Sequence, residues 1–141
     1  VIDDIGEMKA HGVAIKPGHP VGFGVVEETP IVTLPGYPVS CVVNSFEFVR
    51  RGVRRLLGVD DGPEPTARCT LEEKIASEVG SKTYTRVELD KKDNGRIARP
   101  VRTKGAGVLS SVAHADGFVV APEEREGYAV GEEVDVLLWE A

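Results

Sequence analysis

Two loops rich in proline and glycine carry the residue types of this sequence that could bind an anion. The first covers residues 16–20 (KPGHP), and the second covers residues 34–40 (LPGYPVS). An apolar, β-branched stretch precedes the second loop and residues with helical spacing follow it. The second loop should therefore present unpaired N–H groups and the positive end of a helix dipole at one corner, which favours a negatively charged ligand.

Individual residues of the two loops strengthen this interpretation. Gly36 lets the backbone approach a ligand closely, and Ser40 adds a hydroxyl donor in the first helical turn. Lys16 can supply a point charge, and His19 a further donor. The alternative is an ordinary strand-to-helix turn beside a solvated lysine and histidine.

The elements that must position these loops are short strands and one long helix. Apolar residues recur three and four positions apart from 39 to 57, which predicts a helix, with Pro38 at its first position and Gly58 as its stop. Strands are expected at 13–15, 21–26 and 30–34. If these strands share a sheet, both loops emerge at its carboxyl edge, where open α/β folds bind ligands.

The N-terminal end predicts a helix that ends near Gly12, with Val1, Ile2, Ile5 and Met8 on one face. This region has fewer strands than a parallel sheet requires, and the sequence does not start with Met. We therefore expect a fragment of a longer protein, in which residues 1–58 form part of an α/β layer.

A proline-containing polar linker at 59–66 separates this region from a C-terminal part with alternating apolar residues. Short alternating stretches at 67–71, 83–89, 96–102, 117–122 and 133–139, with a turn at Asn94-Gly95, predict a small β-barrel or sandwich over residues 67–141.

The amino-acid composition of the chain argues against some classes of binding partner. The formal net charge of −6 over 141 residues argues against nucleic acid and anionic membranes as partners. No apolar run approaches the roughly 20 residues of a membrane span, and no signal peptide is recognisable. The two cysteines, Cys41 and Cys69, lie far apart without metal-ligand spacing, and reduced thiols fit a cytoplasmic protein.

Three ordered motifs resemble the MoeA family of molybdopterin molybdenumtransferases, which is related to the E domain of gephyrin. They are residues 13–24 (VAIKPGHPVGFG), 34–40 (LPGYPVS) and 109–117 (LSSVAHADG). The corresponding family patterns are close to IKPGKP…G, LPGNPVS…F and L-x-S-L-A-x-A-N-G. The resemblance covers nearly the whole chain.

The resemblance implies an enzyme that takes adenylylated molybdopterin and molybdate and, with Mg²⁺, releases AMP and leaves molybdenum on the dithiolene. It implies a partial α/β pterin-binding (MogA-like) domain at 1–58, a linker at 59–66 and a C-terminal β-barrel domain at 67–141, in a homodimer. The catalytic and Mg²⁺-binding residues would lie upstream of Val1, so the 141 residues alone should be inactive. The substrate-binding residues expected here are Lys16, Pro17, Gly18, His19, Pro20, Pro35, Gly36, Pro38, Ser40, Arg86 and Ser111.

Two positions depart from the family pattern. His19 stands where the pattern has a second lysine, and Tyr37 stands where it has asparagine. Both differences change the charge or polarity of the expected anion pocket. Two alternatives therefore stay open: a non-catalytic anion- or protein-binding module on the same scaffold, and an unrelated α/β-plus-barrel protein.

Overall fold

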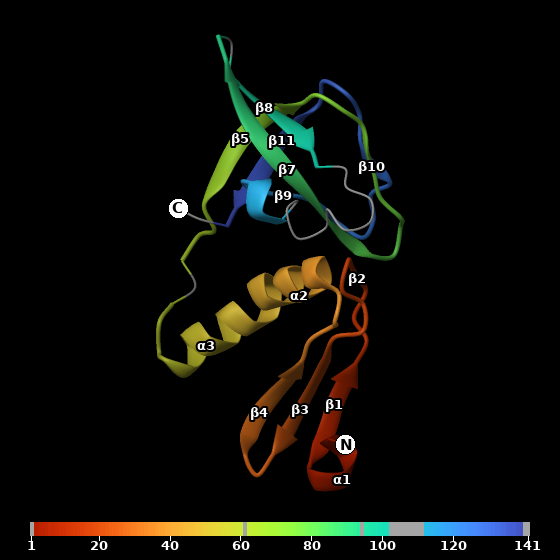
Figure 1. Ribbon diagram of the computed structural model, residues 1–141, viewed down its shortest axis with the longest axis vertical. Coiled ribbons are helices and arrows are strands. Elements are labelled where there is room, and N and C mark those ends of the chain that lie inside the picture. The colour runs from red at the N-terminus through yellow and green to blue at the C-terminus, as the bar shows by residue number, and fades with distance from the viewer. Residues whose placement is uncertain (1, 61, 94, 102–111, 140–141) are drawn as a thin grey trace. The chain divides into compact units, whose positions relative to one another are not determined.

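The computed structural model describes residues 2–60, 62–93, 95–101 and 112–139, and the chain separates into two compact units, residues 1–61 and 62–141 (Figure 1). None of the helices that the structure describes has the length and apolar character needed to cross a membrane.

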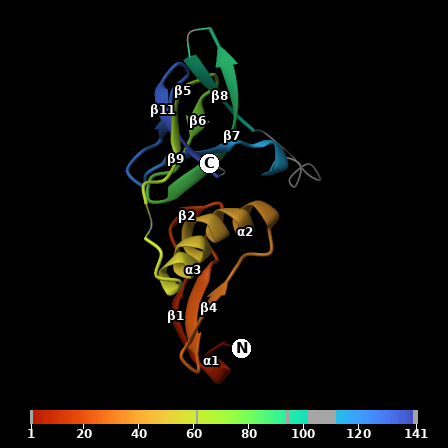
Figure 2. The same cartoon turned by 90° about the vertical axis from the view of Figure 1, so that its left-hand side faces the viewer.

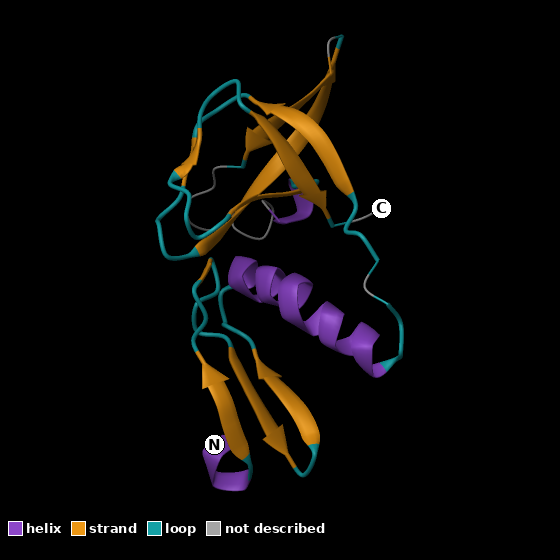
Figure 3. Ribbon diagram, turned by 180° about the vertical axis from the view of Figure 1, so that it is seen from behind, coloured by secondary structure: helices purple, strands orange, loops and turns teal. Residues whose placement is uncertain are grey.

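The N-terminal unit contains a three-stranded antiparallel sheet in the order β1 (Glu7–His11), β3 (Gly22–Val26) and β4 (Thr29–Thr33) (Figure 3). Strands β3 and β4 confirm the expected pair of strands. Glu27 and Glu28 form the turn between them with φ angles of 46° and 67°, as the mirror-image turns of β-hairpins require. Every pairing within this sheet is antiparallel.

The expected helix up to Gly12 is wrong, since helix α1 covers only Ile2–Ile5 and Met8 lies in β1. The glycines of β3 explain the difference: a Cβ atom on Gly24 would lie 2.9 Å from the Glu7 carbonyl oxygen. This bare strand surface lets the N-terminal segment pair closely as a strand, and the tertiary pairing overrides the helical spacing. The strand expected at 13–15 is reduced to β2 (Ile15–Lys16).

The long helix runs through three consecutive segments, α2 (Pro38–Asn44), the π-helical η1 (Ser45–Val49) and α3 (Arg50–Leu56). Pro38 begins it as expected. Gly58, with φ 68°, ends it in a Schellman motif, in which the Gly58 and Val59 N–H groups donate to the Arg55 and Arg54 carbonyls.

The expected apolar face of the long helix is buried only in part. Val43 and Phe46 are buried, but Leu56 and Leu57 near the end of the helix are 74% and 71% exposed. The π-helical segment between these two pairs is not recognisable from the apolar spacing.

The C-terminal unit is a closed ring of strands, which confirms the expected small β-barrel. The ring order is β7-β8-β5-β11-β9, and β9 pairs back onto β7 (Figure 2). All pairings in the ring are antiparallel except β5–β8, which is parallel. The strands are β5 (Thr66–Leu71), β7 (Lys82–Lys92), β8 (Gly95–Pro100), β9 (Gly117–Ala121) and β11 (Glu133–Leu138), and β6 (Ile75–Ala76) with β10 (Gly127–Tyr128) forms a separate pair.

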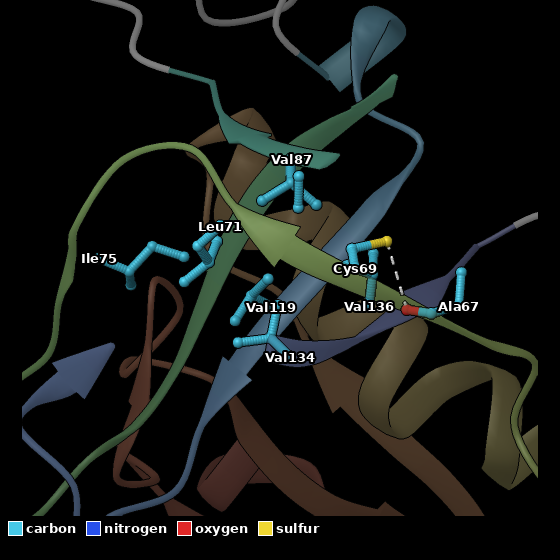
Figure 4. Close-up of a cluster of buried hydrophobic side chains, with 9 residues drawn as sticks. Ala67, Cys69, Leu71, Ile75, Val87, Val119, Val134 and Val136 are labelled. Carbon is cyan, nitrogen blue, oxygen red and sulfur yellow. Dashed lines mark hydrogen bonds between the residues drawn. The ribbon is translucent and has the colours of Figure 1, made fainter. Parts of the chain in front are cut away.

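The interior of this barrel is filled by the inward-facing residues of the alternating strands (Figure 4). In β5 the odd-numbered residues are buried and the even-numbered residues are exposed, as the sequence alternation predicts. Burial raises the pKa of the Cys69 thiol, whose Sγ lies 3.5 Å from the Ala67 carbonyl oxygen. The cluster comprises Ala67, Cys69, Leu71, Ile75, Val87, Ala98, Val119, Val134 and Val136.

A carboxylate on the loop before β11 should contribute to the acid sensitivity of this unit. The Ala129 N–H, which donates to Glu132 at 2.9 Å, and the paired Arg125 guanidinium hold the pKa of the Glu132 carboxyl below its usual range. A lowered folded-state pKa stabilises the fold above the unfolded-state pKa of about 4.3, and this stabilisation is lost as pH falls through the folded-state value.

We therefore expect Glu132→Gln to lower the urea unfolding midpoint at pH 7 and to lose this difference from the wild type at pH 3. Urea titrations at both pH values measure the effect. Glu124→Gln, at an exposed turn residue of the same unit, should match the wild type throughout. An effect of Glu132→Gln that is equal at the two pH values would contradict the assignment.

Candidate functional site

The two loops that carry the predicted anion-binding residues emerge at the same edge of the N-terminal sheet. The last row of this edge is formed by His11, Gly22 and Thr33, which are register partners on β1, β3 and β4. The first loop lies within the connection, residues 12–21, from the end of β1 to the start of β3, and the second loop leaves the end of β4. The antiparallel pairing of β3 to both neighbours makes β1 and β4 run in the same direction, so the loops share an edge without a parallel sheet.

Hydrogen bonds from the residues on either side of the first loop fix its path. The Val21 N–H donates to the Gly18 carbonyl at 3.2 Å, and the Val13 N–H donates to the His19 carbonyl at 2.9 Å. His19 Nδ1 lies 2.7 Å from the Val13 carbonyl oxygen. Since a carbonyl can only accept, Nδ1 is the donor, and this nitrogen of the exposed His19 is used inside the loop.

The lysine and glycine of this loop are more enclosed than the histidine. Lys16 and Pro17 are half-buried and joined by a cis peptide bond, Gly18 is buried, and Pro20 is exposed. Gly18 adopts φ 125°, a conformation that residues with a side chain rarely adopt.

The second loop leads directly into the start of the helix. Tyr37 is the N-cap residue, is 80% exposed and makes no side-chain capping hydrogen bond. The Cys41 N–H makes the first intrahelical bond, to the Tyr37 carbonyl at 2.9 Å. The N–H groups of Val39 and Ser40 come before that bond. The first N–H groups of a helix have no acceptor within the helix, so these two are available as donors to a ligand.

The remaining predicted residues of this loop differ in exposure. Ser40 is buried and Pro35 is also buried, whereas Pro38 is half-buried. Gly36 is exposed, and a Cβ atom added to it would meet no described atom within 4 Å.

Asn44 joins the two loops, although the sequence motifs do not identify it. Its Nδ2 donates to the Gly18 carbonyl at 3.1 Å and to the Ser40 carbonyl at 2.8 Å, and its side chain is fully buried. The signal that could have revealed it is a lone amide inside a helix, directly after the buried Val43 and one turn beyond Ser40.

Two predicted residues belong to the C-terminal unit. Arg86 lies in β7, half-buried, and burial lowers the pKa of its guanidinium. Ser111 lies outside the described residues. Among the residues that the structure describes, no three histidine, cysteine, aspartate or glutamate side chains converge as a metal site would need.

The chain matches known proteins along both units. A family model described as the MoeA C-terminal region (domain IV) matches residues 68–139. A Methanocaldococcus jannaschii protein named for molybdopterin biosynthesis is 36% identical over 137 residues, which cover 97% of this chain and 31% of that protein. Molybdopterin molybdenumtransferase 2 of Mycobacterium tuberculosis is 34% identical over 124 residues, which cover 88% of this chain and 30% of that protein.

A solved structure extends the likeness to the fold. The crystal structure of a molybdopterin biosynthesis MoeA protein from Pyrococcus horikoshii superposes with a TM-score of 0.84 and 37% identity, over 99% of this chain and 34% of that one. This chain thus spans about a third of the length of the relatives that it matches. Since the domain model covers just over half of the chain and the likeness continues through the rest, the chain is a member of the MoeA family, with that family's C-terminal region at residues 68–139.

Proposed function

We propose that this chain supplies the molybdate-binding loops of a molybdopterin molybdenumtransferase, which inserts molybdate into adenylylated molybdopterin and releases AMP. The observation that carries the proposal is the meeting of the two loops at one edge of the sheet, where Asn44 bonds to both. The names of the family's curated members support the same reaction class.

The residues of this edge suit a tetrahedral dianion. Molybdate needs N–H, hydroxyl and cationic donors and no neighbouring carboxylate. The N–H groups of Val39 and Ser40, the Ser40 hydroxyl and Lys16 provide such donors, and neither loop contains an acidic residue. The contribution proposed for this chain is therefore anion binding.

Further parts of the proposal concern the protein in which these loops act. Residues 1–58 would be the C-terminal half of a MogA-like pterin-binding domain, residues 59–66 a linker and residues 67–141 the barrel domain of a cytoplasmic homodimer. Arg86 and Ser111 would contact the substrate. The 141 residues alone should release no AMP from adenylylated molybdopterin, and clear turnover in that assay would refute this part.

A protein-binding role on the same scaffold is the second candidate. The exposed apolar side chains of Leu56 and Leu57 favour it, because neighbouring exposed leucines suit a protein partner. A chain that binds no oxyanion would favour this role over the enzyme.

The experiment that tests the proposal measures oxyanion binding to the 141-residue chain. Calorimetric titration with molybdate should give saturable binding, and anomalous scattering from tungstate-soaked crystals should show density near Ser40 and Lys16. Ser40→Ala should weaken molybdate binding about tenfold or more, because a hydrogen bond to a charged group is worth about 1.5–3 kcal/mol.

Two substitutions of the same residue types, in the other unit of the chain, serve as controls. Ser81→Ala and Lys91→Ala lie in the C-terminal unit, outside both loops, and should bind molybdate as the wild type does. Tungstate density only at other surface lysines, or equal binding by Ser40→Ala and the wild type, would count against the proposed site.

A further inference from the structure

We propose that Asn44 is a positioning residue that holds the first loop, residues 16–20, against the start of the helix, so that both loops present their donors to one anion. This inference rests on the proposed function for its consequence, but its structural part can be tested without any ligand.

The first observation is the bridge itself. A single buried amide nitrogen donates to Gly18 in one loop, at 3.1 Å, and to Ser40 in the helix start, at 2.8 Å. These two residues are 22 positions apart in the sequence and lie at the same edge of the sheet. The Asn44 side chain is therefore a direct link between the two halves of the proposed site.

The second observation is that this link is not needed to satisfy the carbonyls that it contacts. The Gly18 carbonyl already accepts the Val21 N–H, and the Ser40 carbonyl belongs to the hydrogen-bond ladder of α2. The Asn44 Oδ1 atom, in contrast, is buried and has no hydrogen-bond partner among the residues that the structure describes. A buried acceptor without a partner lowers stability, so packing of the fold alone gives no reason for an amide here.

The third observation is how closely the loop lies on the amide. A Cβ atom on Gly18 would lie 2.2 Å from Asn44 Nδ2 and 3.3 Å from Oδ1. The backbone of the loop therefore packs directly on the Asn44 side chain, and the path of the loop depends on the size and polarity of this residue.

These observations indicate that Asn44 positions the first loop and does not itself contact the ligand. The Nδ2 group is already engaged with two carbonyls, and Oδ1 is an acceptor that would repel an oxyanion. Asn44 must therefore act through Gly18 and Ser40. Asn44 would then lower the stability of the fold while it fixes the geometry of the binding site, which is the trade-off between stability and function that binding sites often show.

Two variants of the 141-residue chain test the inference. Asn44→Ala removes the bridge and the unpartnered acceptor together, in a helix that favours alanine. Asn44→Asp keeps the shape but faces the two carbonyls with a carboxylate, and it also brings negative charge to the proposed site. Ser45→Ala, at the next helix position, is the matched control.

The first readout is amide hydrogen exchange of Val13 and Val21, whose N–H groups donate to carbonyls of the first loop. Asn44→Ala should raise both exchange rates tenfold or more relative to the β3–β4 hairpin, and its thermal unfolding midpoint should equal or exceed that of the wild type. Unchanged exchange at these amides would overturn the inference. A lowered midpoint with uniformly faster exchange would assign Asn44 a packing role and would also overturn it.

The second readout is the dissociation constant for molybdate. Asn44→Ala should weaken binding about tenfold, Asn44→Asp more strongly, and Ser45→Ala not at all. Wild-type affinity in Asn44→Ala would overturn the positioning role while leaving the proposed function intact. If the wild type itself binds no molybdate, the proposed function fails, and the exchange measurement still decides whether Asn44 positions the loop.

Discussion

Alanine in place of Gly18 should weaken molybdate binding by about tenfold to a hundredfold. The φ angle of 125° at this position is accessible almost only to glycine, and forcing another residue into it costs about 1–3 kcal/mol. The new Cβ atom would also lie 2.2 Å from Asn44 Nδ2. The loop must therefore move away from the helix start, and calorimetric titration with molybdate measures the loss.

Gly52→Ala is the matched control for this substitution. Gly52 lies in α3, is exposed, and a Cβ atom there would meet nothing within 4 Å. Alanine should leave molybdate binding unchanged and should raise stability by up to about 1 kcal/mol through helix propensity. Binding of wild-type strength by Gly18→Ala would show that the first loop is not part of the anion site.

The largest loss of stability is expected from Phe118→Ala in the barrel. Phe118 is fully buried and makes edge-to-face contacts with Tyr84, at 5.5 Å between ring centroids, and with Trp139, at 4.9 Å. Truncation of a buried phenylalanine costs about 3–5 kcal/mol. Urea unfolding followed by the fluorescence of Trp139, the single tryptophan of the chain, reports on the unit that contains the substitution.

A truncation at an exposed position separates this effect from a general loss of apolar surface. Val130 in the same unit is 64% exposed, and Val130→Ala should change stability by less than about 0.5 kcal/mol. A similar change in both variants would mean that the three aromatic rings contribute little to the stability of the barrel.

The barrel strands could be predicted from the sequence because apolar and polar residues alternate along a strand when only one of its faces is buried. Ala67, Cys69 and Leu71 point into the core as expected, since only one face of β5 is buried. The closure of the ring could not be predicted, because the parallel pairing of β5 with β8 is a long-range choice that leaves no local pattern. The sequence also predicts a short helix from Val108 to Ala115, and most of this stretch lies outside the described residues.

The N-terminal unit shows how tertiary contacts override local patterns. Met8 has helical spacing from Ile5 but lies in β1, because the glycines of β3 accept a close neighbour. The two loops could be identified from their residue types and from the helix signals at Pro38 and Gly58. The motifs did not point to Asn44, because its contact with Gly18, 26 positions earlier in the chain, leaves no local pattern.

The closed ring of the barrel also bears on how this protein would aggregate. Strands β5, β7, β8, β9 and β11 each pair with two neighbours, so none of these five is an edge strand of the kind to which another molecule adds a strand. In the sheet of the N-terminal unit, β1 and β4 each pair only with β3 among its strands. Intermolecular strand addition at high protein concentration should therefore begin at these two borders, where Pro30 already obstructs part of β4.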